Sequence, residues 1–213
     1  VAMNTPGQNS NAVAELAFGL MLYMIRNRWN GASGSELRGK KLGIQAYGHI
    51  GRIMAQIAKG FGMEVYGFTR SEANKKQMAE DGVKLLASVE ELYSTCNFVS
   101  THVPAKDNTK KSLNYELLSK MPKGGILVNT ARKEIIDEDG LLKLLAERED
   151  FRYISDIEPE KKDEFLKFGD RVLFTAKKMG AQTAEANINA GLAAAQQIVR
   201  FLKDGDRTFQ VNK

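Results

Sequence analysis

A candidate phosphate-binding loop is formed by six consecutive residues, Ala46-Tyr47-Gly48-His49-Ile50-Gly51. The spacing is that of G-x-G-x-x-G with alanine at the first glycine. Gly48 would let the backbone approach a pyrophosphate, and Gly51 would let the next helix pack closely on the strand before it. The helix N-terminus would offer free N–H groups to the phosphates. Because Ala46 adds only one methyl group, we expect the turn to be kept. The alternative is an ordinary strand–helix turn with His49 on its surface.

The residues after the second strand bear on the choice of dinucleotide. An acid about 20 residues beyond the loop usually holds a ribose 2′-hydroxyl. This chain has Thr69 and Arg70 there. Without a carboxylate, Arg70 could pair with a 2′-phosphate, which favours NADPH. Thr69 could instead hydrogen-bond the ribose of NADH, and both interpretations stay open.

An arginine stands where a substrate would bind. Arg132 follows an apolar run, residues 125–129, that is typical of a strand. A guanidinium at that place can grip the carboxylate of a 2-oxo acid by two parallel hydrogen bonds. The alternative is an ordinary surface arginine.

These residues need a scaffold, and strand-like and helix-like segments alternate along the chain. The predicted strands cover 41–47, 64–69, 83–85, 98–102, 125–129, 153–157 and 172–175. The predicted helices cover 13–26, 51–61, 71–81, 89–93, 115–120, 137–148 and 183–203. Short, wholly apolar strands are typical of parallel sheets, so we expect an α/β fold, a Rossmann-type doubly wound parallel sheet. Ligands of such sheets bind at the carboxyl ends of the strands.

Composition excludes several other classes of protein. The chain has 213 residues and a net charge of +5, with its lysines and arginines scattered, so we expect no nucleic-acid partner. One cysteine, Cys96, rules out an internal disulfide, and two histidines argue against a metal site. No apolar run reaches the length of about 18 residues needed to span a membrane. We expect a small-molecule substrate and a reducing, cytoplasmic compartment.

Several spaced blocks resemble the D-2-hydroxyacid dehydrogenase family, and most of all its short-type D-3-phosphoglycerate dehydrogenases. Besides the glycine loop, the similar blocks are Asn4-Thr5-Pro6 with 12–15, His102-Val103-Pro104 with Thr109, 128–132 with 136–138, and 179–183. The resemblance runs through nearly the whole chain. It implies a nicotinamide cofactor, NAD with NADP possible, and a substrate that is a 2-hydroxy or 2-oxo acid.

The resemblance also assigns roles to residues. The implied cofactor-binding residues are Tyr47, Gly48, His49, Ile50, Gly51, Thr69, Arg70, His102, Val103, Pro104, Thr109, Thr130, Ala131, Asp156, Gly180 and Ala181. Asp156 falls on the family's contact to the nicotinamide carboxamide, and Arg132 on its substrate-binding arginine. Lys133 departs from the family glycine and would add bulk near the cofactor edge.

The family's catalytic histidine is missing, and Lys178 stands in its place. Reduction of a ketone needs a proton donor at the oxygen, and an ammonium group can serve. Burial and the nearby Arg132 would both lower the pKa of this lysine. Glu158, in a Glu-Pro pair, is the candidate for the family's orienting glutamate, although it lies too close to Asp156 for the usual spacing. The alternative for Glu158 is a solvated acidic loop.

The resemblance implies a protein of two lobes. Residues 1–213 correspond to the cofactor lobe, with 1–30 leading in, 183–213 returning, and most of the substrate lobe absent. We therefore expect this chain to bind a dinucleotide but to turn over poorly. The family suggests a homodimer, with helix 13–26 as an apolar interface. Three functions stay open: a D-3-phosphoglycerate dehydrogenase, a glyoxylate or hydroxypyruvate reductase using NADPH, and a non-catalytic dinucleotide-binding module.

Overall fold

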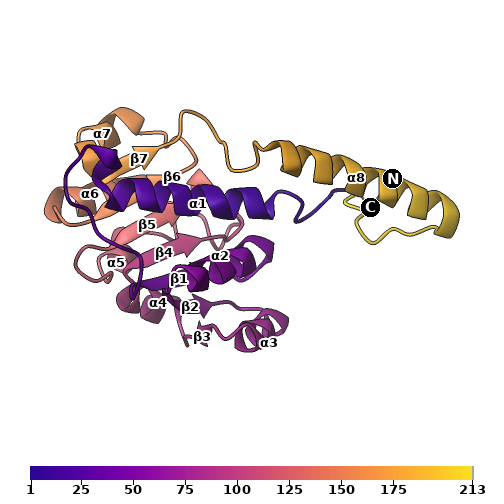
Figure 1. Ribbon diagram of the computed structural model, residues 1–213, viewed down its shortest axis with the longest axis horizontal. Coiled ribbons are helices and arrows are strands. Elements are labelled where there is room, and N and C mark those ends of the chain that lie inside the picture. Colours follow the sequence, from indigo (N-terminus) through magenta and orange to yellow (C-terminus); the bar gives the residue numbers. More distant parts are fainter. Residues whose placement is uncertain (213) are drawn as a thin grey trace.

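The computed structural model describes residues 1–212, and its centre is a parallel sheet of seven strands (Figure 1). The strands are β1 (Lys41–Gln45), β2 (Glu64–Phe68), β3 (Lys84–Leu85), β4 (Phe98–Thr101), β5 (Ile126–Asn129), β6 (Arg152–Ser155) and β7 (Val172–Phe174). Their order is β3-β2-β1-β4-β5-β6-β7, so the direction of winding reverses between β1 and β4. The predicted doubly wound Rossmann-type sheet is confirmed, and ligand sites of such sheets lie at this reversal.

The helices fill the connections between the strands. They are α1 (Ser10–Ile25), α2 (His49–Gly60), α3 (Glu72–Glu80), α4 (Val89–Thr95), α5 (Tyr115–Leu118), α6 (Glu138–Glu147), α7 (Lys162–Leu166) and α8 (Ala184–Asp204). Short 3₁₀ turns are η1 (Asn27–Trp29), η2 (Lys133–Ile135) and η3 (Gly169–Arg171). Each predicted strand and helix is present, with its ends displaced by at most three residues. The sequence analysis missed α7, because its single buried residue, Phe165, leaves no helical period to detect.

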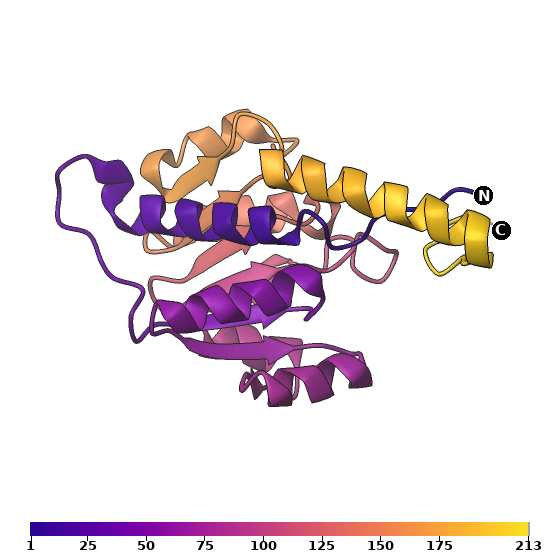
Figure 2. The same ribbon diagram turned by 45° about the vertical axis from the view of Figure 1, so that its right-hand side comes forward.

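Two apolar clusters pack on the two faces of the sheet. Figure 2 shows α1 (indigo) and α2 (purple) on the near face. Side chains alternate along a strand, so neighbouring residues enter opposite clusters. Phe98 packs with α1 and α2, whereas Val99 packs with α4, α5 and α6. Ile126 and Leu127 of β5 divide in the same way. Burial on both faces fixes the strands, and with them the loops at their carboxyl ends.

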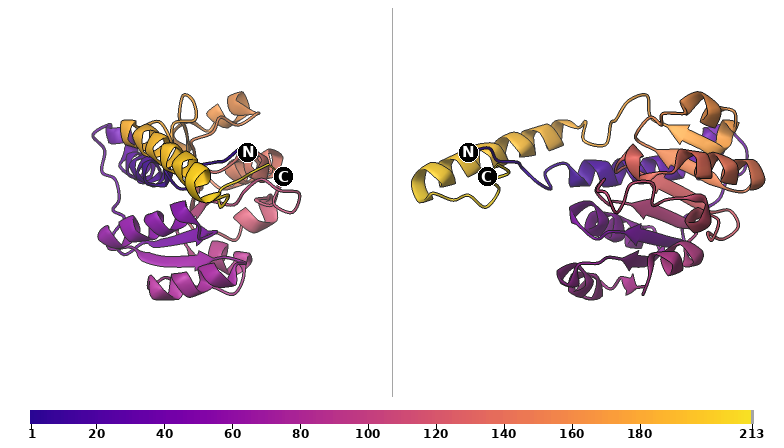
Figure 3. Two further views of the ribbon diagram at one scale, coloured as in Figure 1. Left: turned by 90° about the vertical axis from the view of Figure 1, so that its right-hand side faces the viewer. Right: turned by 180° about the vertical axis from the view of Figure 1, so that it is seen from behind.

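The last helix lies outside this layered body. In Figures 1 and 3, α8 extends away from the sheet, and both ends of the chain lie beside its far half. Met3 and Gln210 form an antiparallel bridge there. Ile188 and Leu202 on α8 are 60% and 76% exposed. The chain thus leaves an apolar helix face uncovered next to its paired termini.

Helix α1, which we expected at a dimer interface, packs in the core of its own chain. Most apolar side chains of α1, including Phe18, Met21 and Ile25, are buried in the chain's own core. The apolar character of 13–26 is therefore explained by packing on α2. A homodimer through α1 stays a proposal, and it would have to use partly exposed side chains such as Leu20 and Tyr23.

Candidate active site

The glycine loop joins β1 to α2 at the carboxyl edge of the sheet. Ala46 has a φ of 73°, in the left-handed region, so alanine does keep the turn that glycine usually makes. A Cβ atom at Gly51 would lie 2.6 Å from the Ala46 carbonyl oxygen, which explains the glycine that lets α2 pack closely. Gly48 faces open space, and His49 is exposed.

The first turn of α2 fits an anion. Its N-cap residue, Gly48, provides no side-chain cap, and the turn holds no acidic residue. The N–H groups of this turn therefore keep their hydrogen-bonding capacity and their partial positive charge. Ile50 stands in the same turn and is half-buried. This part of the loop can take the pyrophosphate of a dinucleotide.

Three buried polar atoms without partners lie at the carboxyl ends of β4 and β5, on the other side of the strand reversal. They are Thr101 Oγ1, His102 Nδ1 and Thr130 Oγ1. The other ring nitrogen of His102 lies 3.1 Å from Ser100 Oγ. Burial lowers the pKa of His102 to about 4, so the ring is neutral at pH 7. Because buried polar atoms rarely stay unpaired, these three fit a polar ligand at the carboxyl edge of the sheet.

The remaining candidate cofactor-binding residues, after β2 and β4, differ in their exposure and in whether protein groups already bond their side chains. Thr69 is buried, and its hydroxyl accepts a hydrogen bond from Ser71 N. Arg70 is exposed. Thr109 closes its own loop by donating to the Pro104 carbonyl at 2.6 Å, so its hydroxyl shapes the loop 102–109. In that loop Val103 is half-buried and Pro104 exposed.

Arg132 and Lys178, far apart in the sequence, meet at one backbone oxygen. Arg132 Nη1 lies 2.7 Å from the Ala131 carbonyl, and Lys178 Nζ lies 3.4 Å from the same oxygen. Among residues 1–212, neither cation has a carboxylate within 4.0 Å. Two cations that share a carbonyl and lack an ion-pair partner form a site for an added anion.

The environment changes the chemistry of Lys178. Its pKa lies below the ordinary value of 10.5, first because of partial burial and second because of Arg132. Asp156 and Glu134 oppose this shift. The residue as a whole is exposed, so the ammonium keeps access to a substrate. The direction and both causes agree with the expectation from the sequence.

Two buried side chains position this pair, and the sequence analysis did not identify them as such. Asn129 accepts from Ala131 N at 3.0 Å and donates to the Arg132 carbonyl at 2.9 Å. The fully buried Asp156 carboxylate accepts from Thr175 Oγ1 and from the N–H groups after Lys178, at Met179 and Gly180. Protein donors thus occupy both oxygens that were expected to face a nicotinamide, with Ala181 half-buried next in the chain. The sequence signal that could have identified Asn129 and Asp156 as positioning residues is a polar residue at the end of a buried strand.

Two charged residues point elsewhere. Glu158 is exposed and pairs with Lys162 at 2.8 Å, which is the solvated acidic loop considered above. The structure therefore does not bring it to Lys178. Lys133 pairs with Glu160 at 2.9 Å, so its bulk is directed to the loop after β6.

Within residues 1–212, none of the helices combines the length and the hydrophobicity that a membrane span requires. The same residues hold no group of three or more His, Cys, Asp or Glu side chains that could bind a metal ion.

Comparison with known proteins places this chain in a family. The family described as D-isomer specific 2-hydroxyacid dehydrogenase, NAD binding domain, matches residues 19–177. A D-3-phosphoglycerate dehydrogenase of Haemophilus influenzae is 36% identical over 98% of this chain and 55% of its own length. A hydroxypyruvate reductase of Thermotoga maritima is 32% identical over 94% of this chain and 69% of its own.

A solved structure agrees with these relatives. The NAD⁺-bound 3-phosphoglycerate dehydrogenase of Entamoeba histolytica superposes with a TM-score of 0.88 at 43% identity, over 99% of this chain and 67% of that one. The chain spans about half the length of the first curated relatives it matches, 55% and 41%.

Proposed function

Because the chain belongs to the D-isomer-specific 2-hydroxyacid dehydrogenase family and matches its NAD-binding domain, we propose that its protein oxidises a D-2-hydroxy acid with NAD. The observation that carries the proposal is the meeting of Arg132 and Lys178 at one carbonyl, with no carboxylate of residues 1–212 within 4.0 Å of either cation. We also propose that residues 1–213 act as the cofactor lobe, with 183–213 leading back to a substrate lobe.

In this proposal the cofactor contacts lie at the carboxyl edge of the sheet. The open first turn of α2 holds the pyrophosphate, and the unpaired atoms of Thr101, His102 and Thr130 receive the rest of the dinucleotide. When bound, the nicotinamide supplies the acceptor of a hydride from C2 of the substrate. The neutral His102 can take part as a hydrogen-bond partner without adding charge.

Arg132 and Lys178 divide the work on the substrate. Arg132 binds the carboxylate, and its fixed backbone sets where C2 stands. In the oxidation, neutral Lys178 Nζ takes the proton of the C2 hydroxyl. In the reduction, its ammonium returns that proton to the carbonyl oxygen. A lysine has no tautomer to fix, so the lack of an ion-paired glutamate on Lys178 among residues 1–212 is consistent with this role.

For the substrate we favour 3-phosphoglycerate, since the relatives named D-3-phosphoglycerate dehydrogenase cover 95% or more of this chain. The second candidate is a hydroxypyruvate or glyoxylate reductase that uses NADPH. It is favoured by the exposed Arg70, which follows β2 without a carboxylate, and by the Thermotoga maritima relative.

The test is a rate comparison in the protein that carries both proposed lobes, with 3-phosphohydroxypyruvate, hydroxypyruvate and glyoxylate, each with NADH and with NADPH. The proposal expects the highest kcat/KM with 3-phosphohydroxypyruvate and NADH. A preference for glyoxylate or hydroxypyruvate with NADPH would favour the second candidate. Binding of NADH without turnover of any of the three would leave only a dinucleotide-binding module.

A further inference from the structure

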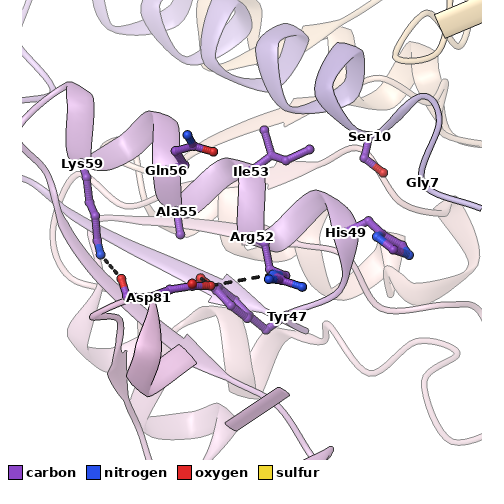
Figure 4. Close-up of a pocket in the computed structure, with 10 residues that line it drawn as sticks. All are labelled: Gly7, Ser10, Tyr47, His49, Arg52, Ile53, Ala55, Gln56, Lys59 and Asp81. Atoms are coloured by element: carbon purple, nitrogen blue, oxygen red, sulfur yellow. Dashed lines mark hydrogen bonds and ion pairs between the residues drawn. The ribbon is translucent and has the colours of Figure 1, made fainter. Parts of the chain in front are cut away.

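The side chain of Tyr47 leaves the glycine loop and enters the protein. Tyr47 is fully buried, and its hydroxyl donates to Asp81 Oδ2 at 2.9 Å. Figure 4 shows the ring lying below α2, with Asp81 at its far end, beside a cavity of about 420 Å³. Tyr47 can therefore contact a cofactor through its backbone and not through its hydroxyl, although the sequence analysis predicted only that the residue binds the cofactor.

Asp81 is itself held in place. Gln77 Nε2 donates to its other oxygen at 3.0 Å, and Arg52 Nε of α2 lies 3.8 Å from Oδ2. Lys59, also on α2, donates to the Asp81 backbone carbonyl. The acceptor of the Tyr47 hydroxyl is thus fixed to the end of α3 and to two turns of α2.

The residue before Tyr47 is the strained one. A left-handed φ costs an alanine on the order of 1 kcal/mol, so the surroundings must hold Ala46 there. One restraint is the hydrogen bond from Ala46 N to the Phe68 carbonyl, at 2.9 Å. A second restraint is the buried side chain of Tyr47, the residue that follows Ala46.

We propose that the hydrogen bond from Tyr47 to Asp81 is a brace that holds the strained turn at Ala46 and so positions the first N–H groups of α2. Tyr47 is then a positioning residue for the dinucleotide. The inference rests on the proposed binding of NADH at this loop. It explains how a loop without its first glycine keeps the geometry that phosphate binding needs.

The test removes only the hydroxyl, in Tyr47→Phe. We expect the Kd for NADH to rise about fivefold, the size of one lost hydrogen bond. Without NADH, amide exchange in 46–52 becomes faster, and this readout does not depend on the proposed function. Tyr115→Phe is the matched control, because it removes a tyrosine hydroxyl that also donates to a carboxylate, Glu147 at 2.6 Å, outside the loop.

Two further variants sharpen the result. In an Ala46→Gly background the brace is not needed, so Tyr47→Phe should change the Kd and the exchange less. Asp81→Asn weakens the same bond from its other end and should act in the same direction if Tyr47→Phe folds poorly. Unchanged exchange in 46–52 in Tyr47→Phe would overturn the proposal, and so would an equal effect in the glycine background. If the parent chain does not bind NADH, the proposed function fails while the exchange result still decides on the brace.

Discussion

The two halves of the candidate site, the glycine loop after β1 and the loops that carry Arg132 and Lys178, are built by different means. On the β1–α2 side, six consecutive residues present backbone N–H groups to a ligand. On the side of β5 to β7, two side chains 46 residues apart, Arg132 after β5 and Lys178 after β7, meet because buried Asn129 and Asp156 hold their backbones. The difference implies that cofactor binding and reaction can be separated by substitution.

The largest expected effect is in the reacting half, at Lys178. Lys178→Ala removes the group that moves the proton, so kcat of the full-length protein should fall about 10³-fold. The Kd for NADH should stay at the parent value, because the backbone half is untouched. The neighbouring exposed lysine provides the control, and Lys177→Ala should leave kcat unchanged. A kcat of Lys178→Ala close to the parent would remove the lysine from the mechanism.

Arg132 should affect substrate binding more than cofactor binding. Arg132→Ala removes the guanidinium that holds the carboxylate, so KM for the 2-oxo acid should rise about 10- to 100-fold. Arg132→Lys keeps the charge but loses the two parallel hydrogen bonds, and should recover only part of the affinity. Steady-state kinetics in both directions give the measurement. Full recovery by lysine would show that charge alone is required.

The pH dependence should reveal the coupling between the two cations. Reduction needs the Lys178 ammonium, so its rate should fall as the pH rises through a pKa that lies below 10.5, while oxidation gains there. In Arg132→Ala one cause of the lowered pKa is gone, and the falling limb should move to higher pH. A limb at the same pH in both proteins would argue that another group controls the rate.

The smallest effect is expected in the backbone half. Ala46→Gly relieves a left-handed alanine with a φ of 73°. The free energy of unfolding should rise by roughly 0.5 kcal/mol, because the relief slightly exceeds the added freedom of the unfolded chain. Urea denaturation measures it, with Ala87→Gly on an ordinary loop as the reference substitution. A loss of stability at both positions would mean that the turn is not strained.

The same contrast explains what the sequence could predict. The glycine loop is local, so residue types and spacing were enough to place it after β1 and before α2. The apolar periods likewise located the strands that the structure contains. The position of Arg132 followed from its strand, and its neighbour Lys178 from a family resemblance.

What the sequence left open is which partner each side chain takes. Glu158 was chosen for its Glu-Pro neighbourhood, but Lys162, four residues later, pairs with its carboxylate. Tyr47 was assigned with its loop, and only the packing of α3 shows that its hydroxyl belongs to Asp81. Spacing along the chain cannot indicate which side-chain partner is found across the fold.

The most direct test of separate halves is a calorimetric titration of the Arg132→Ala/Lys178→Ala double variant with NADH. Our account predicts a Kd within about threefold of the parent, since the pyrophosphate contacts lie on the backbone of the other half. It also predicts no measurable turnover in the same preparation. A Kd weakened by more than about tenfold in a folded double variant would contradict it, and would mean that the two cations hold the cofactor.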